Sequence, residues 1–235
     1  MEEKKNLKYQ GGCLNNMKVL VTGGTSGIGK SIYDNIKSLC TEIVKTSRKE
    51  LDTSSIDSTN KFIKKYKDMK FDALILNTGG PPDLKFEEIS NEIWLENFNK
   101  LFLSFANLIK ELKINKDGYI FLISSFIIKE PDDTLIMSSS LRSGFVSLFK
   151  SLSKLHSKNK ISFINLAPGP IMTKRLENLL KNENETIENF SKNLPHGRVP
   201  EPSELGLFVK FVLENKIKAF NGVTIPFDSG LLKGL

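Results

Sequence analysis

Thirteen residues near the N-terminus carry the first pattern in this chain that is able to do chemistry. Residues 19–31 read VLVTGGTSGIGKS. From Gly24, the string GTSGIGKS fits the G-x-x-x-x-G-K-[ST] loop that binds ATP or GTP. From Thr22, the string TGGTSGIG fits a T-G-x-x-x-G-x-G turn that binds a nicotinamide dinucleotide. The first interpretation predicts phosphoryl transfer, and the second predicts redox chemistry.

Both interpretations require the same local structure. Val19, Leu20 and Val21 form a short apolar run typical of a buried strand, and apolar residues then recur at helical spacing from Ile28 to Leu39. Glycines between a strand and a helix allow the backbone to turn tightly and to approach a ligand closely. The amides of the first helical turn and the positive end of the helix dipole then face a phosphate. The pattern therefore predicts a phosphate-binding turn.

Phosphoryl transfer also requires an acidic residue at the end of a second apolar strand, where it holds Mg²⁺. The later apolar runs end instead in Asn77, in Ser124-Ser125 and in Ala167-Pro168. Lys30 and Ser31 are then interpreted as first-turn helix residues that face solvent. An ATP- or GTP-using protein remains a remote alternative, and a dinucleotide is the favoured ligand.

Strands and helices alternate along the chain and must position these residues. Apolar runs predict strands at 19–21, 42–46, 71–76, 118–124, 161–166 and 223–227. Helical periodicity predicts helices after the glycine turn and at 59–66, 92–112, 139–155 and 202–214. Such alternation is typical of a parallel sheet that is covered by helices on both faces. Ligands of these sheets bind at the carboxyl ends of the strands.

Composition narrows the setting of the protein. A chain of 235 residues that is 39% hydrophobic suits one α/β domain, and residues 1–16 are expected to be an N-terminal tail without the apolar core of a signal peptide. No apolar run approaches the roughly 18 residues of a membrane span. Two cysteines favour a reducing cytoplasm. The net charge of +7 comes from lysines interleaved with acids, which favours a solvated surface over a nucleic-acid partner.

Further motifs stand at the ends of the predicted strands. They read Leu51-Asp52-Thr53, Asn77-Thr78-Gly79-Gly80, Pro168-Gly169-Pro170-Ile171-Met172-Thr173, and Asn221-Gly222 with Asp228-Ser229-Gly230. In order and spacing, these motifs and TGGTSGIG make the chain from Met17 onward resemble the short-chain dehydrogenase/reductase family. The run NTGGPP at 77–82 resembles a divergent branch of it. The resemblance implies a Rossmann-type doubly wound sandwich, with a parallel sheet of about seven strands and helices on both faces, as a single NAD(P)-binding domain over 17–235.

The resemblance also implies which residues hold the dinucleotide. Ser47 stands where relatives that prefer NAD carry an acid, and Arg48 follows it. Because a guanidinium there can pair with a 2′-phosphate, NADP(H) is favoured over NAD(H). Arg142 is implied at the nicotinamide ribose, and no metal site is implied. The implied cofactor-binding residues are Thr22, Gly23, Thr25, Ser26, Gly27, Ile28, Gly29, Ser47, Arg48, Asp52, Asn77, Thr78, Gly79, Arg142, Pro168, Gly169, Ile171 and Thr173.

The catalytic positions depart from the family pattern. Members transfer a hydride between the nicotinamide and a carbonyl carbon, using a Tyr as proton donor, a Lys that lowers the pKa of that Tyr, a Ser and an Asn. Here Ser125 stands at the Ser position, but Ser138 stands at the Tyr position and Arg142 at the Lys position. Leu101 stands at the Asn position. The implied catalytic residues are therefore Ser125, Ser138 and Arg142.

This set leaves two hypotheses open. A serine hydroxyl is a far weaker acid than a phenol, and a guanidinium stays charged, so Ser138 and Arg142 do not simply replace Tyr and Lys. Ser125 and Ser138 can still hydrogen-bond a carbonyl, and Arg142 can bind the nicotinamide ribose or a substrate carboxylate or phosphate. One hypothesis is an oxidoreductase similar to 3-oxoacyl reductases, with an atypical active site. The other is a dinucleotide-binding sensor or scaffold without turnover.

The resemblance has further implications for substrate and assembly. If the protein is an enzyme, its expected partner is a small-molecule carbonyl or alcohol substrate. Neither a nucleic acid nor a membrane is expected as a partner. Residues 174–200 are implied to be a lid over that substrate. A homodimer or homotetramer is implied through the helices at 92–112 and 139–155. The apolar residues of these helices are equally explained by burial on the sheet.

Overall fold

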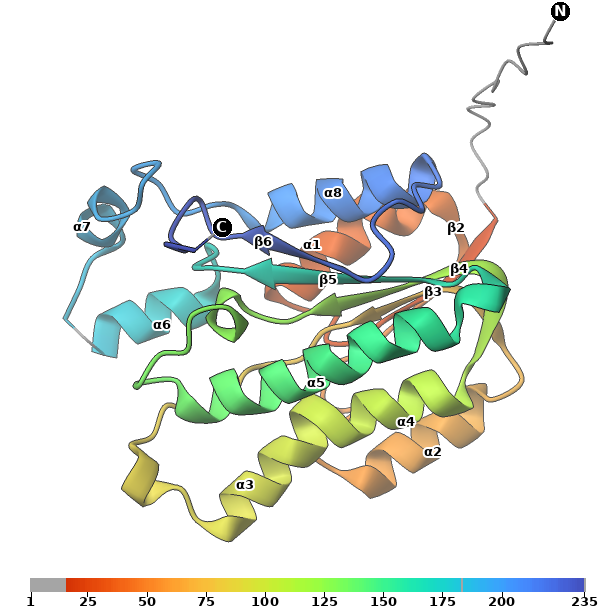
Figure 1. Ribbon diagram of the computed structural model, residues 1–235, viewed down its shortest axis with the longest axis horizontal. Coiled ribbons are helices and arrows are strands. Elements are labelled where there is room, and N and C mark those ends of the chain that lie inside the picture. Colours follow the sequence, from red (N-terminus) through yellow and green to blue (C-terminus); the bar gives the residue numbers. More distant parts are fainter. Residues whose placement is uncertain (1–15, 183, 235) are drawn as a thin grey trace, which may run out of the picture.

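The computed structural model describes residues 16–182 and 184–234, and its centre is a six-stranded parallel sheet (Figure 1). The strands are β1 (Met17–Val21), β2 (Cys40–Lys45), β3 (Lys70–Leu76), β4 (Lys113–Ile123), β5 (Ser162–Pro168) and β6 (Val223–Phe227). The described residues thus form six strands, close to the number of about seven that the resemblance implies. Of the predicted tail, residues 1–15 lie outside the described part, and Asn16 directly precedes β1.

The strand order creates the place where a ligand can bind. The strands lie in the order β2-β1-β3-β4-β5-β6. The connection that leaves β1 therefore leads to β2 on one side, and the connection that leaves β3 leads to β4 on the other side. The connections leaving β1 and β3 thus pass to opposite sides and open a crevice at the carboxyl ends of these strands. The glycine turn follows β1, and Asn77 follows β3, so both predicted motifs reach this crevice.

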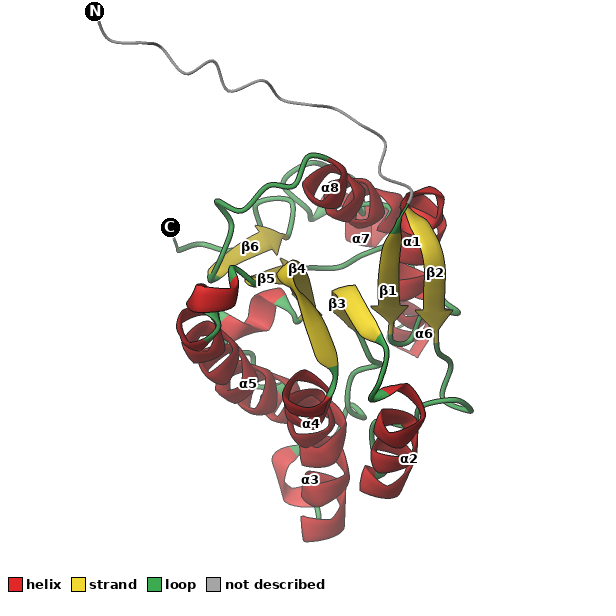
Figure 2. Ribbon diagram, turned by 90° about the vertical axis from the view of Figure 1, so that its right-hand side faces the viewer, coloured by secondary structure: helices red, strands yellow, loops and turns green. Residues whose placement is uncertain are grey.

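Helices cover both faces of the sheet, as the continuous apolar strands predict (Figure 2). One face packs against α1 (Gly27–Ile36) and α8 (Pro202–Glu214), and the other packs against α2 (Ile56–Tyr66), α4 (Ser104–Glu111) and α5 (Ile136–Leu155). Successive strand residues point to opposite faces. Val19 and Val21 accordingly join the core under α1 and α8, whereas Leu20 joins the core under α4 and α5.

The helix predicted at 92–112 has an irregular centre. It consists of α3 (Asn91–Phe98), a π-helical turn (Asn99–Leu103) and α4. A π-turn holds one residue more than an α-turn, so it changes which side chains face the sheet and the crevice. The helix predicted at 139–155 begins three residues earlier, at Ile136, and therefore includes Ser138.

The remaining elements are short or lie beyond the sheet. Helices α6 (Lys174–Asn182) and α7 (Ile187–Lys192) lie beyond the carboxyl ends of β5 and β6, within the predicted lid (Figure 1). Single 3-10 turns stand at Lys37–Leu39, Phe86–Glu88, Phe126–Ile128 and Ser157–Asn159. Among the described residues, the helices are too short or too polar to cross a bilayer.

Candidate active site

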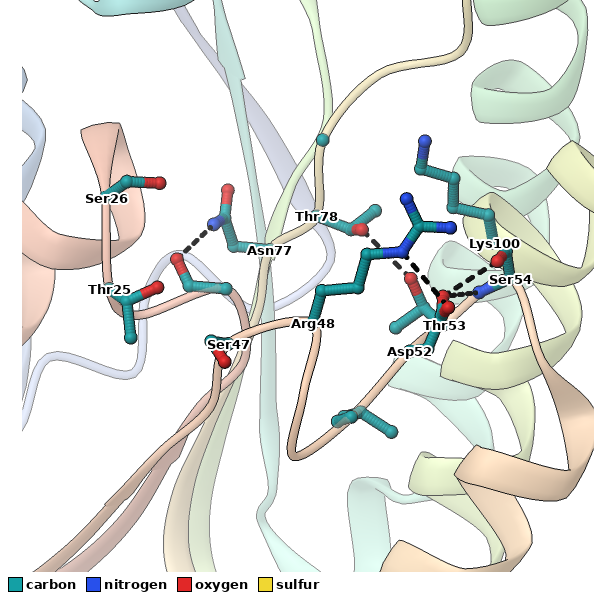
Figure 3. A pocket seen from close by; sticks show the side chains of 13 residues that line it. Thr25, Ser26, Ser47, Arg48, Asp52, Thr53, Ser54, Asn77, Thr78 and Lys100 are labelled. Carbon is teal, nitrogen blue, oxygen red and sulfur yellow. Dashed lines mark hydrogen bonds and ion pairs between the residues drawn. The ribbon is translucent and has the colours of Figure 1, made fainter.

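A cavity of about 270 Å³ opens at the carboxyl ends of β1, β2 and β3 (Figure 3). Its walls come from the glycine turn, the loop after β2, the loop after β3 and the π-turn. The lining residues are Gly23, Thr25, Ser26, Ser47, Arg48, Leu51, Asp52, Thr53, Ser54, Asn77, Thr78, Gly79 and Lys100. The structure thus brings together, at one place, residues that are up to 77 positions apart, from Gly23 to Lys100.

The turn after β1 is built so that only glycine fits at two points. Gly23 has a positive φ of 57°, and a Cβ atom there would lie 2.8 Å from the Asn77 side-chain nitrogen. A Cβ atom on Gly29 would lie 2.2 Å from the Gly23 carbonyl oxygen. Thr22 donates its hydroxyl to the Asn77 carbonyl at 2.7 Å and accepts the Asn77 amide at 2.8 Å. These contacts join the ends of β1 and β3 and give the turn one shape.

The N-terminus of α1 keeps its backbone donors free. Its N-cap residue, Ser26, makes no side-chain capping hydrogen bond, and the first turn contains no acidic residue. By contrast, Ser55 caps α2 and Ser90 caps α3 through side-chain oxygens. Free first-turn amides at the positive end of a helix dipole bind anionic groups such as phosphate. The N-terminus of α1 therefore fits a pyrophosphate better than the capped helices do.

Lys30 takes no part in this arrangement. Its ammonium pairs with Asp34 one turn along α1, and its side chain is 58% exposed. The lysine of an ATP- or GTP-binding loop reaches the β- and γ-phosphates instead. The geometry thus gives no support to the triphosphate interpretation.

The loop after β2 brings Arg48 and Asp52 to the cavity and places Glu50 against Ser47. Arg48 is exposed, and its Nε donates to Asp52 Oδ2 at 3.1 Å, which raises the pKa of the guanidinium (Figure 3). Glu50 accepts hydrogen bonds from the backbone amide of Ser47, at 2.7 Å, and from the Ser47 hydroxyl. These bonds lower the pKa of Glu50. Glu50, which sequence reasoning missed, thus places a carboxylate against Ser47, although Glu50 itself does not line the cavity.

The loops after β2 and β3 are joined across the cavity floor. The hydroxyls of Thr53 and Thr78 lie 2.9 Å apart, and Asp52 accepts hydrogen bonds from the amide and hydroxyl of Ser54. Ser104 of α4 donates its hydroxyl to the Thr53 carbonyl at 2.7 Å. Asp52 and Thr78, both predicted from the sequence, therefore lie in a hydrogen-bonded floor beside Arg48.

Ser138 and Arg142 are in direct contact on α5. Arg142 Nε donates to Ser138 Oγ at 3.1 Å, and Arg142 Nη1 donates to the carbonyls of Ile123 and Ser124, both at 3.2 Å. Both side chains are buried. Burial, with the charge of Arg175, lowers the pKa of Arg142 to about 10, so the guanidinium is still protonated at neutral pH. Two of the three predicted catalytic residues are thus assembled at the carboxyl end of β4.

Ser125, the third predicted catalytic residue, begins the 3-10 turn after β4. It is only partly buried, and its hydroxyl makes no hydrogen bond to another described residue. The Ser125 backbone carbonyl instead accepts the Ile128 amide at 3.3 Å. Its hydroxyl is therefore free for a ligand at the carboxyl end of β4.

The turn after β5 meets the glycine turn from the other side. A Cβ atom on Gly27 would lie 3.5 Å from Thr173 Cγ2, so the two turns are in van der Waals contact distance. Gly169 donates its amide to the Phe227 carbonyl at 2.9 Å, and Ile171 is buried. Pro168, Gly169, Ile171 and Thr173 thus lie beside the cavity, although they do not line it, and they continue the crevice towards β5 and β6.

Two cations near the site were missed by sequence reasoning. Lys100 lines the cavity, and its Nζ donates to the Gly80 carbonyl at 2.9 Å. Arg175 of α6 donates from Nη2 to the Pro81 carbonyl at 3.3 Å. Leu101, which stands at the family's Asn position, is 2% exposed and belongs to the buried part of the π-turn. No sequence signal singles out Lys100, because its neighbours at helical spacing, Asn97 and Ser104, are polar as well.

Comparisons with known proteins agree with this architecture. A family model described as "Enoyl-(Acyl carrier protein) reductase" matches residues 25–232. The chain is 23% identical to the uncharacterized oxidoreductase YvaG of Bacillus subtilis, over 92% of this chain and 96% of that protein. It is 26% identical to the 3-oxoacyl-[acyl-carrier-protein] reductase FabG of Chlamydia muridarum, over 92% and 97%. The solved L-sorbose reductase of Gluconobacter frateurii, in complex with NADPH and L-sorbose, has the same fold, with a TM-score of 0.82, 17% identity and coverage of 94% and 98%.

Proposed function

This chain belongs to the short-chain dehydrogenase/reductase family, and from that premise we propose that it is an NADP(H)-dependent oxidoreductase that interconverts a carbonyl and an alcohol. The observation that carries the proposal is the uncapped N-terminus of α1 beside the cavity that holds Arg48. Free helix amides suit a pyrophosphate, and an exposed guanidinium at the rim suits a 2′-phosphate.

The residues of the crevice fit the dinucleotide from one end to the other. Gly23 to Gly29 would hold the pyrophosphate, and Asp52 and Thr78 would lie at the adenosine. Thr173 would lie at the nicotinamide, beyond the glycine turn. The bound nicotinamide supplies a hydride to the carbonyl carbon of a substrate or accepts one from the corresponding alcohol.

Three side chains of the protein, those of Ser125, Ser138 and Arg142, take part in this chemistry. The free hydroxyl of Ser125 donates a hydrogen bond to the substrate oxygen, and the Ser138 hydroxyl is oriented by Arg142 Nε. Charge that develops on the substrate oxygen is stabilised by the fixed guanidinium of Arg142. Because the pKa of Arg142 is about 10, Arg142 does not release a proton at neutral pH, and the proton that completes the alcohol comes from water.

Absorbance of the reduced nicotinamide tests the proposal. Purified protein is mixed with NADPH and a panel of ketones, oxo acids and β-ketoacyl thioesters. We expect oxidation of NADPH with at least one substrate and recovery of the matching alcohol. Tight NADPH binding without turnover of any substrate would favour the second candidate function, a dinucleotide-binding protein. That candidate is supported by the departure of Ser138 and Arg142 from the family's Tyr and Lys.

A charge reversal at the cavity rim should separate the two cofactors. Arg48→Asp places a carboxylate where we propose the 2′-phosphate, while NADH carries no charge at this point. One lost charge-assisted bond is worth about 1.5 to 3 kcal/mol, so NADPH affinity should fall roughly 10- to 100-fold. Affinity for NADH should change by less than about threefold. Fluorescence titration measures the affinity for both cofactors. Equal losses of affinity for NADPH and NADH would show that the 2′-phosphate does not bind at Arg48.

Glu50 gives a second and opposite effect on cofactor choice. Its carboxylate occupies the Ser47 amide and hydroxyl, which are the donors that a 2′-phosphate at this rim would use. Glu50→Gln removes the negative charge while keeping the length of the side chain. We expect NADPH to bind more tightly by a few-fold and NADH to bind slightly less tightly, because a carboxylate there would accept a ribose hydroxyl. Unchanged affinity for both cofactors would show that Glu50 does not face the ribose.

The setting of the enzyme is part of the proposal. We propose a single cytoplasmic domain over 17–235, with residues 174–200 as a lid over a small-molecule substrate. We also propose a homodimer or homotetramer through α3, α4 and α5. Exposed apolar side chains on α3, Leu95 and Phe98, support that assembly.

A further inference from the structure

Two cations contact the segment that follows β3, and a third contacts the end of the neighbouring strand β4. Lys100 and Arg175 hold the Gly80 and Pro81 carbonyls, respectively, and Arg142 holds the carbonyls at the end of β4. Leu76 of β3 pairs with Leu122 of β4, so the two segments leave the sheet side by side. Lys100, Arg142 and Arg175 are called the cation cluster below.

The three charges of the cation cluster act on one another. The pKa of Lys100 is lowered by burial and by the charges of Arg175, Arg48 and Arg142, with Glu96 opposing. The pKa of Arg142 is lowered by burial and by Arg175. Like charges therefore repel the ammonium of Lys100 and the guanidinium of Arg142, and this repulsion costs free energy in the folded protein.

Within the described residues, none of these three side chains forms an ion pair. Arg48 and Arg198, by comparison, each have a carboxylate partner. Backbone carbonyls satisfy some donors of the cluster but carry no full negative charge. Of the three, Arg142 is buried, Lys100 is half-buried and Arg175 is exposed. A buried charge is normally paired, because leaving one without a counter-charge is costly. The cluster therefore has the electrostatics of a site that is completed by an anion.

The position of Arg175 indicates which anion completes the cluster. Arg175 lies on α6, two residues after Thr173, and so belongs to the proposed lid and not to the adenosine side of the cavity. Its guanidinium lies flat on Gly80, where a Cβ atom would be 2.5 Å from Nη1 and 2.7 Å from Cζ. A guanidinium offers two parallel donors that match a carboxylate or a phosphate. The phosphates of the dinucleotide are accounted for at α1 and at Arg48.

We propose that the cation cluster binds an anionic group of the substrate, a carboxylate or a phosphate, and so makes this enzyme selective for anionic carbonyl compounds. This inference rests on the proposed function, because it names the substrate class of that same site. Arg142 would then lie between the anion and the reacting carbonyl. An arginine suits this position better than the family's Lys, because a guanidinium stays charged and binds anions.

Matched pairs of ligands test the proposal without requiring turnover. Acetoacetate is compared with its methyl ester, and dihydroxyacetone phosphate with dihydroxyacetone, by calorimetry on the protein with and without NADPH. We expect at least one anion to bind about tenfold or more tightly than its neutral partner, as one charge-assisted bond predicts. The two pairs distinguish a carboxylate site from a phosphate site. Neutral partners that bind as tightly as both anions would overturn the proposal.

Two variants and one control locate the effect. Arg175→Gln should reduce the anion preference to less than about threefold and leave NADPH affinity within twofold. Gly80→Ala keeps every charge but places a methyl group where the guanidinium lies, and it should reduce the preference as well. Lys181→Gln removes one exposed charge from the same helix and should change neither quantity. If Arg175→Gln weakens the binding of NADPH as much as the binding of the anion, the cluster binds the cofactor and the proposal is wrong. Anion preference without turnover would count against the proposed function alone.

Discussion

Gly29→Ala should abolish high-affinity cofactor binding. The new methyl group would lie 2.2 Å from the Gly23 carbonyl oxygen and 2.6 Å from the Asn77 side chain, and backbone atoms cannot move aside as a flexible side chain can. The turn must therefore shift, and its free amides at α1 lose their alignment. Loss of two charge-assisted hydrogen bonds of about 1.5 kcal/mol each predicts roughly 100-fold weaker NADPH binding.

Fluorescence titration of NADPH, together with thermal unfolding, measures this effect. Overpacking also costs about 1–3 kcal/mol of folding stability, so the variant should melt at a lower temperature. Gly144→Ala is the matched control, since its methyl group would meet only the Phe102 ring at 3.6 Å, an ordinary contact. Alanine is favoured over glycine within a helix by about 1 kcal/mol, so the control should be neutral or stabilising. Wild-type NADPH affinity in Gly29→Ala would contradict the assignment of the turn.

Arg142→Met should remove turnover while leaving the fold intact. The guanidinium positions Ser138 and supplies the fixed positive charge at the carboxyl end of β4. Removal of one such preorganised donor typically lowers kcat by about 10²- to 10³-fold. Methionine has a similar length, but it leaves the Ser138 hydroxyl and the Ile123 and Ser124 carbonyls without this donor, so lost hydrogen bonds offset the benefit of removing a buried charge.

The combination of the two readouts separates the catalytic role from a structural one. Steady-state kinetics should give a large fall in kcat, whereas the unfolding midpoint should fall by no more than about 10 °C, since the lost hydrogen bonds cost about 1–3 kcal/mol and each kcal/mol lowers the midpoint by about 2–4 °C. A structural role would lower the midpoint and the activity together. Phe149→Leu, in the buried face of the same helix, is the control for a purely structural change, with lower stability and nearly unchanged kcat. Wild-type kcat in Arg142→Met would contradict a catalytic role for Arg142.

The fold was predictable because its signal is local and repeated. Six apolar runs and the helices between them give a parallel sheet whose ends fall within a few residues of the predicted positions, as at Val223–Phe227 and Pro202–Glu214. The boundaries that were wrong lie where a turn extends an element. Helix α5 begins at Ile136 because the loop from Pro131 to Leu135 closes onto its first turn.

The residues that line the cavity were more predictable than the surroundings of Ser138 and Arg142. Ser47, Arg48, Asp52, Asn77 and Thr78 all line one cavity, because each stands at or just beyond a strand end. The parallel sheet places such residues together, whatever their side chains do. Motif spacing therefore suffices for this half of the crevice.

Side chains that fold back or cross between elements could not be predicted in the same way. Glu50 reaches Ser47 through the shape of a loop, and Arg175 reaches Gly80 and Pro81 from a different helix. The π-turn places Lys100 at the cavity and Leu101 in the core. The helical spacing of apolar residues does not reveal that such a turn is present. Each case depends on tertiary geometry and not on the period of the sequence.

Transfer of deuterium tests the central claim most directly. The protein is supplied with NADPH that carries deuterium at C4 of the nicotinamide and with the oxo acid that binds best, and the product alcohol is examined by mass spectrometry. We predict one deuterium on the carbinol carbon of the product, formed by the wild type and suppressed at least about 100-fold in Arg142→Met. Tight NADPH binding with no deuterated alcohol from any carbonyl compound of the panel would contradict the claim that this protein is an oxidoreductase.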